Sequence, residues 1–535
     1  METFNIYYKL ENRIKVCMKK YKNKFKNYLV QNQKGLFKNL QHLSTNLLST
    51  DLDYKQKTSA NIIQKTPYWY FNGSSHLDHS TLFSLGGEFL VEALQKKGFE
   101  CNVLLCAGGP KFSQTGASTN NPSAFMPCMA CYSFKKQNFD KNFLIEFKSK
   151  GTNIIDIHSE NNLNQILKPS LNWILRGNKN LKLSKEFNSR MVEAAKLWLS
   201  FLNDIDKSSL PNSIILFNGM SFPECIIKFF MERNGVNVIT FEGGYKENSI
   251  YFTNENATDY EFPFDINKVL TALEKNKLDN YLKKRFSGDF TRSSTKYWNK
   301  LSDIDDNLKK KYESFNSNVI VFLNVPFDTS QVKASYLFDD IYQWIDELIL
   351  FAEKNTDIHF IFRSHPDEIR SDKRIYEKTS DYILQNTKKD KNISIIDAAD
   401  DTSSYKLINS SDLVLTYNST IGLESAIMNK KTMSAGYSHF SRLDYFKLYQ
   451  DKEEYFNCIK KKLLDKEFDG SDFRNQIQSY FYQMIFESAI DFSEILIPDN
   501  SKKYGFKLIQ RDKINENKID SFENYLVKEL KVLEK

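Results

Sequence analysis

The 535-residue sequence predicts an α/β protein with two Rossmann-like domains in series, each built on a parallel sheet. Two observations support this fold class. Short apolar runs rich in Val, Ile and Phe alternate with amphipathic segments of helical period, as in a parallel sheet covered by helices. The chain is also too long for one ordinary domain, and its length suits two or three domains. We expect a helical N-terminal extension and C-terminal helices around this α/β core.

Residues 1–60 are predicted to form a basic helical arm. Residues 1–40 hold ten Lys or Arg and two Glu, a formal charge of +8, whereas the whole chain carries +7. The remaining residues therefore sum to −1, which argues against a nucleic-acid-binding body. Apolar residues recur in the arm at helical spacing, at Met18, Tyr21, Phe25, Tyr28 and Leu29. Two interpretations stay open: residues 1–40 lie on an anionic membrane surface, or the apolar stripe docks on the body.

The first Rossmann-like domain is predicted over residues 61–265. Strand, helix and strand follow one another at its start, which implies a parallel right-handed unit. Its long polar loop, residues 110–134, is of a kind that is often functional. The predicted strands are 66–73, 101–109, 153–159, 213–220 and 236–244, and the predicted helices are 79–99, 183–205 and 222–233.

A charged helical connector, residues 266–315, is predicted to lead into a second Rossmann-like domain over residues 316–500. The segment 501–535 is predicted to be a charged helical tail, because apolar residues recur there at near-heptad spacing. The predicted strands of the second domain are 317–325, 358–362, 393–397, 412–417 and 431–435, with helices at 334–354 and 420–429.

Several classes of protein are disfavoured. No run of 18 apolar residues and no secretory signal are present, and seven cysteines do not suggest a disulfide framework. We therefore expect a cytoplasmic protein. A zinc site at Cys101, Cys106, Cys128 and Cys131 is disfavoured, because strand alternation puts Cys101 and Cys106 on opposite faces. The role of the Cys128/Cys131 pair stays open, and neither a metal nor a cofactor is expected.

Polar residues follow two predicted strands of the second domain. Arg363 and His365 follow the strand 358–362, and Asn418, Ser419 and Thr420 follow the strand 412–417. Ligands of open α/β sheets collect at the carboxyl ends of the strands. A cationic turn beside a hydroxyl-capped helix start suits a phosphate. Taken singly, each cluster is equally consistent with an ordinary helix cap or a loop histidine.

Glu424 lies one turn into the helix after this second cluster, where a carboxylate can accept hydrogen bonds from ribose hydroxyls. The alternative is a glutamate that only compensates the helix dipole. In the first domain, Asn218 and Glu242 end two strands. Further candidates for donor or acceptor contacts are Asn324, Asp328, His79 and Tyr437, although turn capping explains Asn324 and Asp328 equally well.

The segments RSHPDE (363–368) and SSYKLINSSDLVLTYNSTIGLESAIMNKKTMSAG (403–436) resemble the donor domain of bacterial capsule polysaccharide glycosyltransferases. FLNVPFD (322–328), FNG (217–219) and FEGG (241–244) are also similar to strand ends of that family. The resemblance covers roughly residues 317–440, extends less closely to 210–250, and implies the GT-B fold of two Rossmann-like domains facing a cleft.

The resemblance also implies site residues. Arg363, His365, Ser419 and Thr420 would bind the donor phosphate, and Glu424 would hold the ribose. Glu242 matches the carboxylate that serves as general base in CMP-sugar-dependent relatives, the sialyl and Kdo transferases. Their motif is acidic-acidic-glycine, whereas this chain has Glu-Gly-Gly, which puts the base assignment in doubt.

The expected function is therefore metal-independent transfer of a sugar, of hexosyl or Kdo/sialyl type, to a glycan or lipid-linked acceptor. The donor would be CMP- or UDP-linked, and the enzyme would work at the inner face of the cytoplasmic membrane. Three alternatives remain: a CDP-glycerol-type polyol-phosphate transferase, a GT-B-fold nucleotide-sugar 2-epimerase and a non-catalytic capsule-assembly partner.

Overall fold

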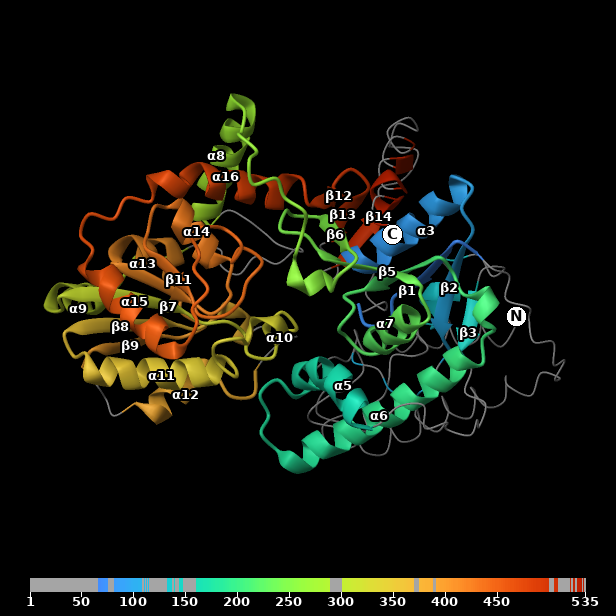
Figure 1. Ribbon diagram of the computed structural model, residues 1–535, viewed down its shortest axis with the longest axis horizontal. Helices are drawn as coiled ribbons and strands as arrows, with labels where there is room; N and C mark the ends of the chain where they lie inside the picture. The colour runs from blue at the N-terminus through green and yellow to red at the C-terminus, as the bar shows by residue number, and fades with distance from the viewer. Residues whose placement is uncertain are drawn as a thin grey trace, which may run out of the picture. The chain divides into compact units, whose positions relative to one another are not determined.

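The computed structural model describes residues 66–533 with gaps, and its β-strands form two large sheets and one small one (Figure 1). The basic arm predicted over residues 1–60 lies outside the described residues, as do His79, Cys128 and Cys131. The longer gaps are 76–80, 115–131, 140–143, 148–159, 289–300, 370–374, 388–390, 500–504 and 509–519.

The first sheet has seven strands in the order β12-β6-β5-β4-β1-β2-β3. Its strands from β5 to β3 are parallel, and β6 and β12 are added antiparallel at one edge. The strands are β1 (Tyr68–Phe71), β2 (Cys101–Cys106), β3 (Leu144–Phe147), β4 (Ser213–Phe217), β5 (Asn237–Gly243), β6 (Ser249–Thr253) and β12 (Ala489–Asp491).

Helices cover both faces of this sheet, because its strands carry apolar side chains on both sides. Trp69 and Phe71 of β1 pack with α5 (Glu160–Leu175), α6 (Leu181–Asn203) and α7 (Glu224–Arg233). Tyr68 and Tyr70 face the other way, toward α3 (Leu82–Lys96). Figure 1 shows α3 and the α5–α6 pair on opposite sides of β1 and β2.

The second sheet has five parallel strands in the order β11-β10-β7-β8-β9. One face packs on α11 (Ile341–Lys354), α12 (Thr379–Asn386) and α15 (Lys452–Leu464), and the other packs on α9 (Asp306–Ser314) and α13 (Ser404–Ser410). The strands are β7 (Ser317–Phe322), β8 (Ile358–Arg363), β9 (Ile393–Ile396), β10 (Leu413–Thr416) and β11 (Thr432–Ser434).

The second domain was predicted to extend to residue 500. In the structure, the chain leaves the second sheet before that position and returns to the first sheet. After α16 (Ser471–Phe486), β12 pairs with β6 of the first sheet. Ile490, Phe492, Val527 and Leu530 then join the core on the α3 side of that sheet. Between Phe492 and Val527, β13 (Leu496–Asp499) and β14 (Gly505–Leu508) form a two-stranded antiparallel sheet. Burial of these apolar side chains accounts for the return.

A third core links the connector to the second sheet. α8 (Ala272–Phe286) packs with α16 and with α14 (Ile421–Ile427), which follows β10. The short helix α10 (Gln331–Ala334) follows β7. The connector therefore packs as part of the region that contains the second sheet. We call this region the second half of the protein, and the region that contains the first sheet the first half.

The described structure confirms the α/β fold class; the second sheet is parallel throughout, whereas the first sheet is parallel from β5 to β3 and has two antiparallel strands at its edge. The predicted strands at 66–73, 101–109, 213–220 and 236–244, and the five of the second domain, are present with slightly different ends. The predicted strand 153–159 lies outside the described residues, and β3, β6, β12, β13 and β14 were not predicted. β14 lies within the segment 501–535, so the prediction of a helical tail was wrong over residues 505–508, which pair with β13. Cys101 and Cys106 do face opposite sides of the first sheet. Among the described helices, none has the length and apolar character that crossing a membrane requires.

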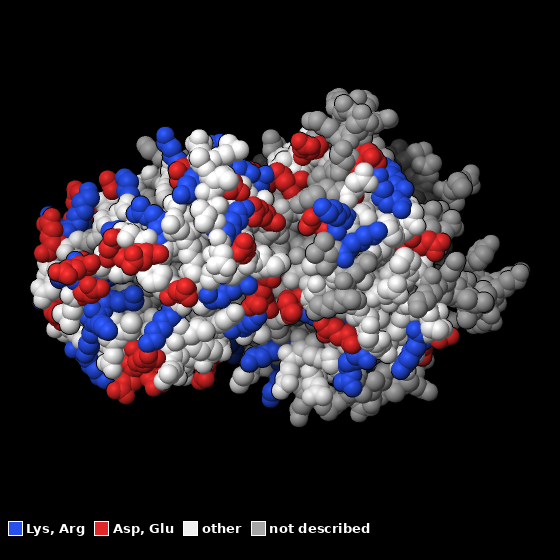
Figure 2. All heavy atoms as spheres, turned by 45° about the horizontal axis from the view of Figure 1, so that its top comes forward, with Lys and Arg blue, Asp and Glu red and all other residues white. Residues whose placement is uncertain are grey.

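Charged side chains are mixed over the described surface. In the view of Figure 2, Lys and Arg side chains alternate with Asp and Glu side chains over both halves. This distribution agrees with the formal charge of −1 that the sequence gives to the residues after position 40.

Candidate functional site

The carboxyl end of β10 presents three of the predicted donor-site residues. Asn418, Ser419 and Thr420 are half-buried between β10 and α14. Thr420 occupies the N-cap position of α14, but its hydroxyl forms no capping hydrogen bond, contrary to the predicted cap. In the described part of the chain, neither the Ser419 nor the Thr420 hydroxyl is bonded to another residue. Both hydroxyls are therefore available to a ligand at this edge.

Asn418 fixes the β10 turn to the loop after β7. Its Oδ1 accepts a hydrogen bond from Gln331 Nε2 at 3.0 Å, and its Nδ2 donates to Ser330 O at 3.2 Å. Asn418 thus holds α10 beside the predicted phosphate site. Asp328 caps the same loop by accepting from the backbone N–H and the hydroxyl of Ser330 at 3.0 and 2.9 Å.

His365 follows β8 at the same edge of the second sheet. Its Nδ1 accepts a hydrogen bond from the backbone N–H of Asp367 at 3.1 Å, so the neutral ring carries its proton on Nε2. Glu368 stabilises this turn, because its buried carboxylate accepts hydrogen bonds from the Thr379 N–H and hydroxyl at 3.1 and 2.7 Å. Burial raises the pKa of Glu368 to about 7. The local structure therefore presents His365 as a donor through Nε2.

Arg363 has a different environment from the one predicted. Its side chain is buried, and its two terminal nitrogens donate to the carbonyl oxygens of Asp397 and Asp400 at 2.8 and 2.6 Å. Burial lowers the pKa of this guanidinium. Because Arg363 holds the loop after β9, it supports the site and does not reach a phosphate in this arrangement.

Glu424 is also placed differently from the prediction of a ribose ligand. Its side chain is 3% exposed and lies against Arg285 of α8, whose Nη2 donates to Oε1 at 2.6 Å. The hydroxyl of Tyr405 donates to Oε2 at 2.6 Å. Burial works to lower the pKa of Arg285, but the charge of Glu424 raises it well above its usual value. Both carboxylate oxygens of Glu424 are thus engaged within the protein, Oε1 in a buried ion pair with Arg285 and Oε2 as the acceptor of the Tyr405 hydroxyl.

Asn218 and Glu242 meet at the carboxyl ends of β4 and β5. Asn218 Nδ2 donates to Glu242 Oε2 at 2.9 Å, and the backbone N–H of Gly243 donates to Oε1 at 3.0 Å. Asn218 has a positive φ of 61°, which turns the chain sharply after β4 and lets its Oδ1 accept from the N–H groups of Met220 and Ser221. The half-buried Glu242 carboxylate is therefore held in one orientation.

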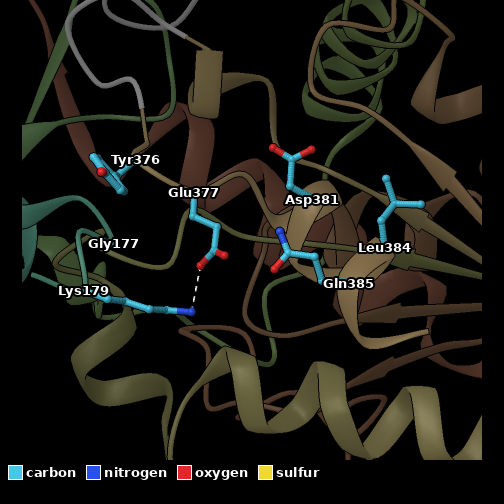
Figure 3. A pocket seen from close by; sticks show the side chains of 7 residues that line it. All are labelled: Gly177, Lys179, Tyr376, Glu377, Asp381, Leu384 and Gln385. Carbon is cyan, nitrogen blue, oxygen red and sulfur yellow. Dashed lines mark ion pairs between the residues drawn. The ribbon is translucent and has the colours of Figure 1, made fainter. Parts of the chain in front are cut away.

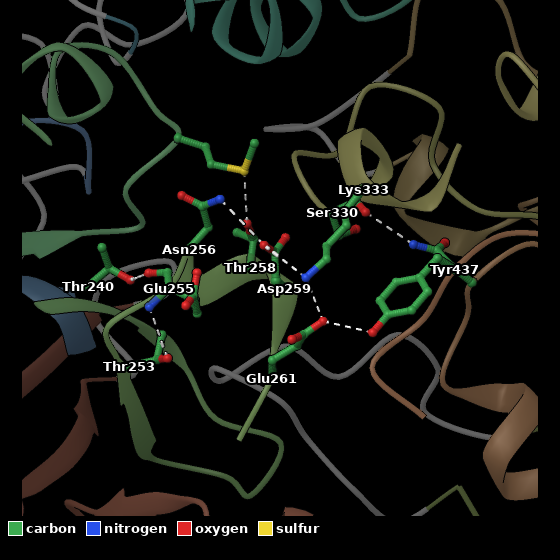
Figure 4. A network of polar contacts seen from close by, with 12 residues as sticks. Thr240, Thr253, Glu255, Asn256, Thr258, Asp259, Glu261, Ser330, Lys333 and Tyr437 are labelled. Carbon is green, nitrogen blue, oxygen red and sulfur yellow. Dashed lines mark hydrogen bonds and ion pairs between the residues drawn. The ribbon is translucent and has the colours of Figure 1, made fainter. Parts of the chain in front are cut away.

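The two halves are joined by a charged network that the sequence did not reveal (Figure 4). Lys333 of α10 donates to Glu261 Oε1 at 2.5 Å, and its Nζ lies 4.0 Å from Asp259 Oδ2. The Tyr437 hydroxyl, a predicted contact, donates to the same Glu261 oxygen at 3.0 Å. Burial works to lower the pKa of Lys333, but its bond to Glu261 and the nearby charges raise it. Lys333 and Glu261 are 72 positions apart, so only the folded structure brings them together.

A buried histidine lies beside this network. His439 Nε2 is 3.0 Å from the Tyr245 hydroxyl, and Nδ1 is 2.8 Å from the Tyr480 hydroxyl. Tyr245 follows the Glu242 turn, and the Tyr260 hydroxyl donates to Gly243 O at 2.6 Å. These aromatic side chains connect the turn that carries Glu242 to the loop after β11.

Glu224, at the start of α7, is a further residue near the site that was not predicted from the sequence. Its Oε1 accepts from the backbone N–H groups of Gly73 and Ser74 at 2.6 and 2.8 Å, which pins the turn after β1. Burial raises the pKa of Glu224 to about 7. An acidic residue in the first turn of a helix is so common that the sequence offered no signal for this role.

Asn324 follows β7 and keeps its Oδ1 without a hydrogen-bond partner among the described residues. An open pocket elsewhere contains none of the predicted site residues (Figure 3). Lys179 and Glu377 form an ion pair at 2.8 Å in that pocket. Its lining consists of Gly177, Lys179, Tyr376, Glu377, Asp381, Leu384 and Gln385. In the described part of the chain, His, Cys, Asp and Glu side chains form no group that could hold a metal ion.

Comparisons with known structures give low similarities. Thermosulfurimonas dismutans KpsC, β-Kdo 2,4 transferase, is 10% identical over 58% of this chain and 87% of its own, with a TM-score of 0.34. The β-Kdo 2,7 transferase of the same organism's KpsC is 14% identical over 59% and 85%, with a TM-score of 0.32. A putative UDP-N-acetylglucosamine 2-epimerase from Listeria monocytogenes is 11% identical over 79% and 93%, with a TM-score of 0.26. These similarities are too low to assign an activity.

The sequence comparisons are more specific. No curated protein matches the chain significantly. Residues 265–445 match the family model described as "Capsule polysaccharide biosynthesis protein". This segment contains the connector from α8 onward, the second sheet, His365 and the β10 turn. It also contains the segments from 317 to 440 that resemble capsule polysaccharide glycosyltransferases. Over residues 265–445, about a third of its length, the chain is therefore similar to capsule polysaccharide biosynthesis proteins.

Proposed function

We propose that this protein is a nucleotide-sugar-dependent glycosyltransferase of capsule or other surface polysaccharide biosynthesis. One observation carries the proposal: each sheet presents polar side chains at the carboxyl ends of its strands. His365, Ser419 and Thr420 do so on the second sheet, and Glu242 with Asn218 on the first. The family match to residues 265–445 supports the biosynthetic role.

In the proposed reaction, a hydroxyl of a glycan or lipid-linked acceptor attacks the anomeric carbon of the donor sugar. The new bond joins the acceptor oxygen to that carbon, and the bond from the carbon to the phosphate oxygen breaks. The acceptor proton passes to the Glu242 carboxylate, which Asn218 and the Gly243 N–H hold in place. The bonding electrons leave with the nucleotide phosphate.

His365 and the two hydroxyls stabilise the charge that develops on this phosphate. Nε2–H of His365 donates to one phosphate oxygen, since Nδ1 is occupied by the Asp367 N–H. Ser419 and Thr420 donate to the others. Preorganised donors of this kind stabilise a leaving phosphate most where charge develops in the transition state. The donor we propose is CMP- or UDP-linked, and the protein would act at the inner face of the cytoplasmic membrane, with residues 1–40 on its anionic surface.

Titration of the full chain with CMP, UDP, CDP and GDP tests the donor site. Binding of one nucleotide, and its weakening in His365→Ala, is expected. Glu242→Gln should keep the nucleotide affinity and lose transfer. Glu232→Gln, on the exposed side of α7, is the matched control. Normal turnover in Glu242→Gln would remove it as the base, and failure of every nucleotide to bind would refute the proposal.

Product analysis separates the proposed transfer from two other reactions. A glycosyltransferase adds the mass of a sugar residue to its acceptor, whereas a polyol-phosphate transferase adds a phosphopolyol. A 2-epimerase changes the donor in the absence of any acceptor. Binding to anionic liposomes by the full chain, and its loss after deletion of residues 1–50, tests the membrane arm.

A further inference from the structure

The donor phosphate of the proposed function calls for a nearby cation, and the predicted one is engaged elsewhere. Arg363 donates to the carbonyl oxygens of Asp397 and Asp400 from a buried position. His365 and two hydroxyls offer hydrogen bonds but no fixed positive charge. A phosphate that must leave with its electrons is stabilised most by a charged donor. Another basic side chain at this edge is therefore expected.

Lys333 has the right position in the fold. It lies in α10, two residues after Gln331, whose Nε2 donates to Asn418 Oδ1 at 3.0 Å. The Tyr437 N–H donates to Ala334 O at 2.9 Å, which ties the loop after β11 to the same helix. α10 is thus clamped between two carboxyl-end loops of the second sheet, and one of them carries Ser419 and Thr420.

The present partners of Lys333 are exposed enough to be exchanged. The Lys333 side chain is 45% exposed and that of Glu261 is 26% exposed. Ion pairs with this much solvent contact contribute little to stability. Figure 4 shows Lys333 extending from α10 toward Glu261 and Asp259, with the Tyr437 ring beside it. A phosphate with more charge than one carboxylate would therefore compete well for this ammonium group.

Two other basic residues contact the carboxyl-end loops of the second sheet, but neither lies on α10. Lys378 lies 3.1 and 3.2 Å from the two oxygens of Asp397, and Ser380 donates to the same carboxylate. The Arg442 guanidinium donates to Phe262 O at 2.6 Å and lies over the rings of Phe262, Phe264 and Tyr480. Of these two and Lys333, only Lys333 combines a long solvated side chain with a place on the Asn418-bound helix.

We propose that Lys333 is a ligand of the donor's phosphate and that Glu261 competes with the phosphate for it. This inference rests on the proposed function and adds a residue to its donor site. Binding of a nucleoside phosphate exchanges the Lys333–Glu261 ion pair for a Lys333–phosphate pair. Release of Glu261 removes one of the contacts between the two halves, so donor binding and the tie between the halves are coupled.

Calorimetric titration of the full chain with CMP and cytidine, and with UDP and uridine, tests this role. Lys333→Met should weaken nucleotide binding roughly 10- to 100-fold, the usual effect of losing a hydrogen bond to a charged group. Binding of the nucleoside should not change, since it has no phosphate. Glu261→Gln should tighten nucleotide binding, and this gain should disappear in the Lys333→Met/Glu261→Gln double variant.

Two lysine variants serve as comparisons. Lys309→Met, in an exposed pair with Asp306 on α9, should bind nucleotide as the unmodified protein does. Lys378→Met tests the competing cation. The inference is overturned if Lys333→Met binds nucleotide normally while His365→Ala does not, or if Lys378→Met alone shows the phosphate-dependent loss. Absence of nucleotide binding by the unmodified protein would instead refute the proposed function together with this inference.

Discussion

Replacement of Glu424 by Gln decides between the predicted ribose contact and the observed ion pair. The substitution keeps the shape of the side chain and removes its charge. Arg285 Nη2 then loses its anionic partner at 2.6 Å, and the Tyr405 hydroxyl loses a charged acceptor. If the structure describes the role of Glu424, the variant should lose stability and keep its nucleotide affinity.

The expected magnitude follows from burial. The side chains of Arg285 and Glu424 are 12% and 3% exposed, so solvent cannot replace the lost partner. Removing one member of a buried pair costs about 3–5 kcal/mol, because the other charge stays buried without compensation. If the region around the second sheet, about 150–250 residues, unfolds as one cooperative domain, each kcal/mol lowers Tm by roughly 2–4 °C. A fall of about 6–20 °C in Tm is therefore expected.

The assay is thermal unfolding followed by circular dichroism, with nucleotide affinity measured on the same preparations. Arg285→Met should be destabilised to a similar extent. The double variant Arg285→Met/Glu424→Leu should recover much of the loss, because an apolar pair can replace a buried ion pair of similar volume. Lys309→Met, which breaks an exposed pair, should leave Tm nearly unchanged.

A different pattern would refute the reasoning. If Glu424→Gln melted like the unmodified protein and bound nucleotide several-fold more weakly, the carboxylate would contact the ligand. The ribose role implied by the family resemblance would then hold, and the ion pair with Arg285 would be one of two arrangements.

Three further predictions concern stability. The pKa of Glu224, raised by burial to about 7, exceeds that of an unfolded glutamate, so the folded protein should lose roughly 3 kcal/mol as pH rises from 4.5 to 7; urea unfolding should show this slope reduced in Glu224→Gln. His359 is buried in β8, where burial and the charge of Lys311 on α9 lower its pKa to about 4. The folded protein should therefore lose stability as pH drops from 6.5 to 4, and urea unfolding should show a smaller loss in His359→Gln. Gly436→Ala would place a Cβ 2.9 Å from Ala334 O, which should cost about 1–3 kcal/mol in thermal unfolding.

Residues on regular elements were the easiest to predict from the sequence. The apolar runs at 213–220, 317–325 and 358–362 are buried strands, because a parallel sheet covered on both faces requires continuous apolar segments. Once the strands were predicted, the positions of their carboxyl ends were predicted as well. Asn218 and Glu242 lie at two such ends, and their side chains are hydrogen-bonded in the structure. This part of the site depends only on strand order and register.

The failures concern partners far apart in the chain. Arg363 and Glu424 have the residue types of a phosphate and ribose site. In the structure, however, Arg363 donates to the carbonyl oxygen of Asp397, and Glu424 forms an ion pair with Arg285. Local sequence shows which groups a side chain carries, and not which groups the rest of the chain brings to it. Lys333 was overlooked for the same reason, since an exposed lysine has no local signature of function.

The return of the chain to the first sheet affects how the protein can fold during synthesis. β12 pairs with β6 only after residues 489–491 have been made, about 240 residues after β6 itself. Until then, the β6 edge lacks its neighbour, and the α3 face lacks Ile490 and Phe492. Such an edge can pair with another nascent chain. We therefore expect fragments that end before residue 489 to aggregate, and the first half to reach its final stability only after the second half has folded.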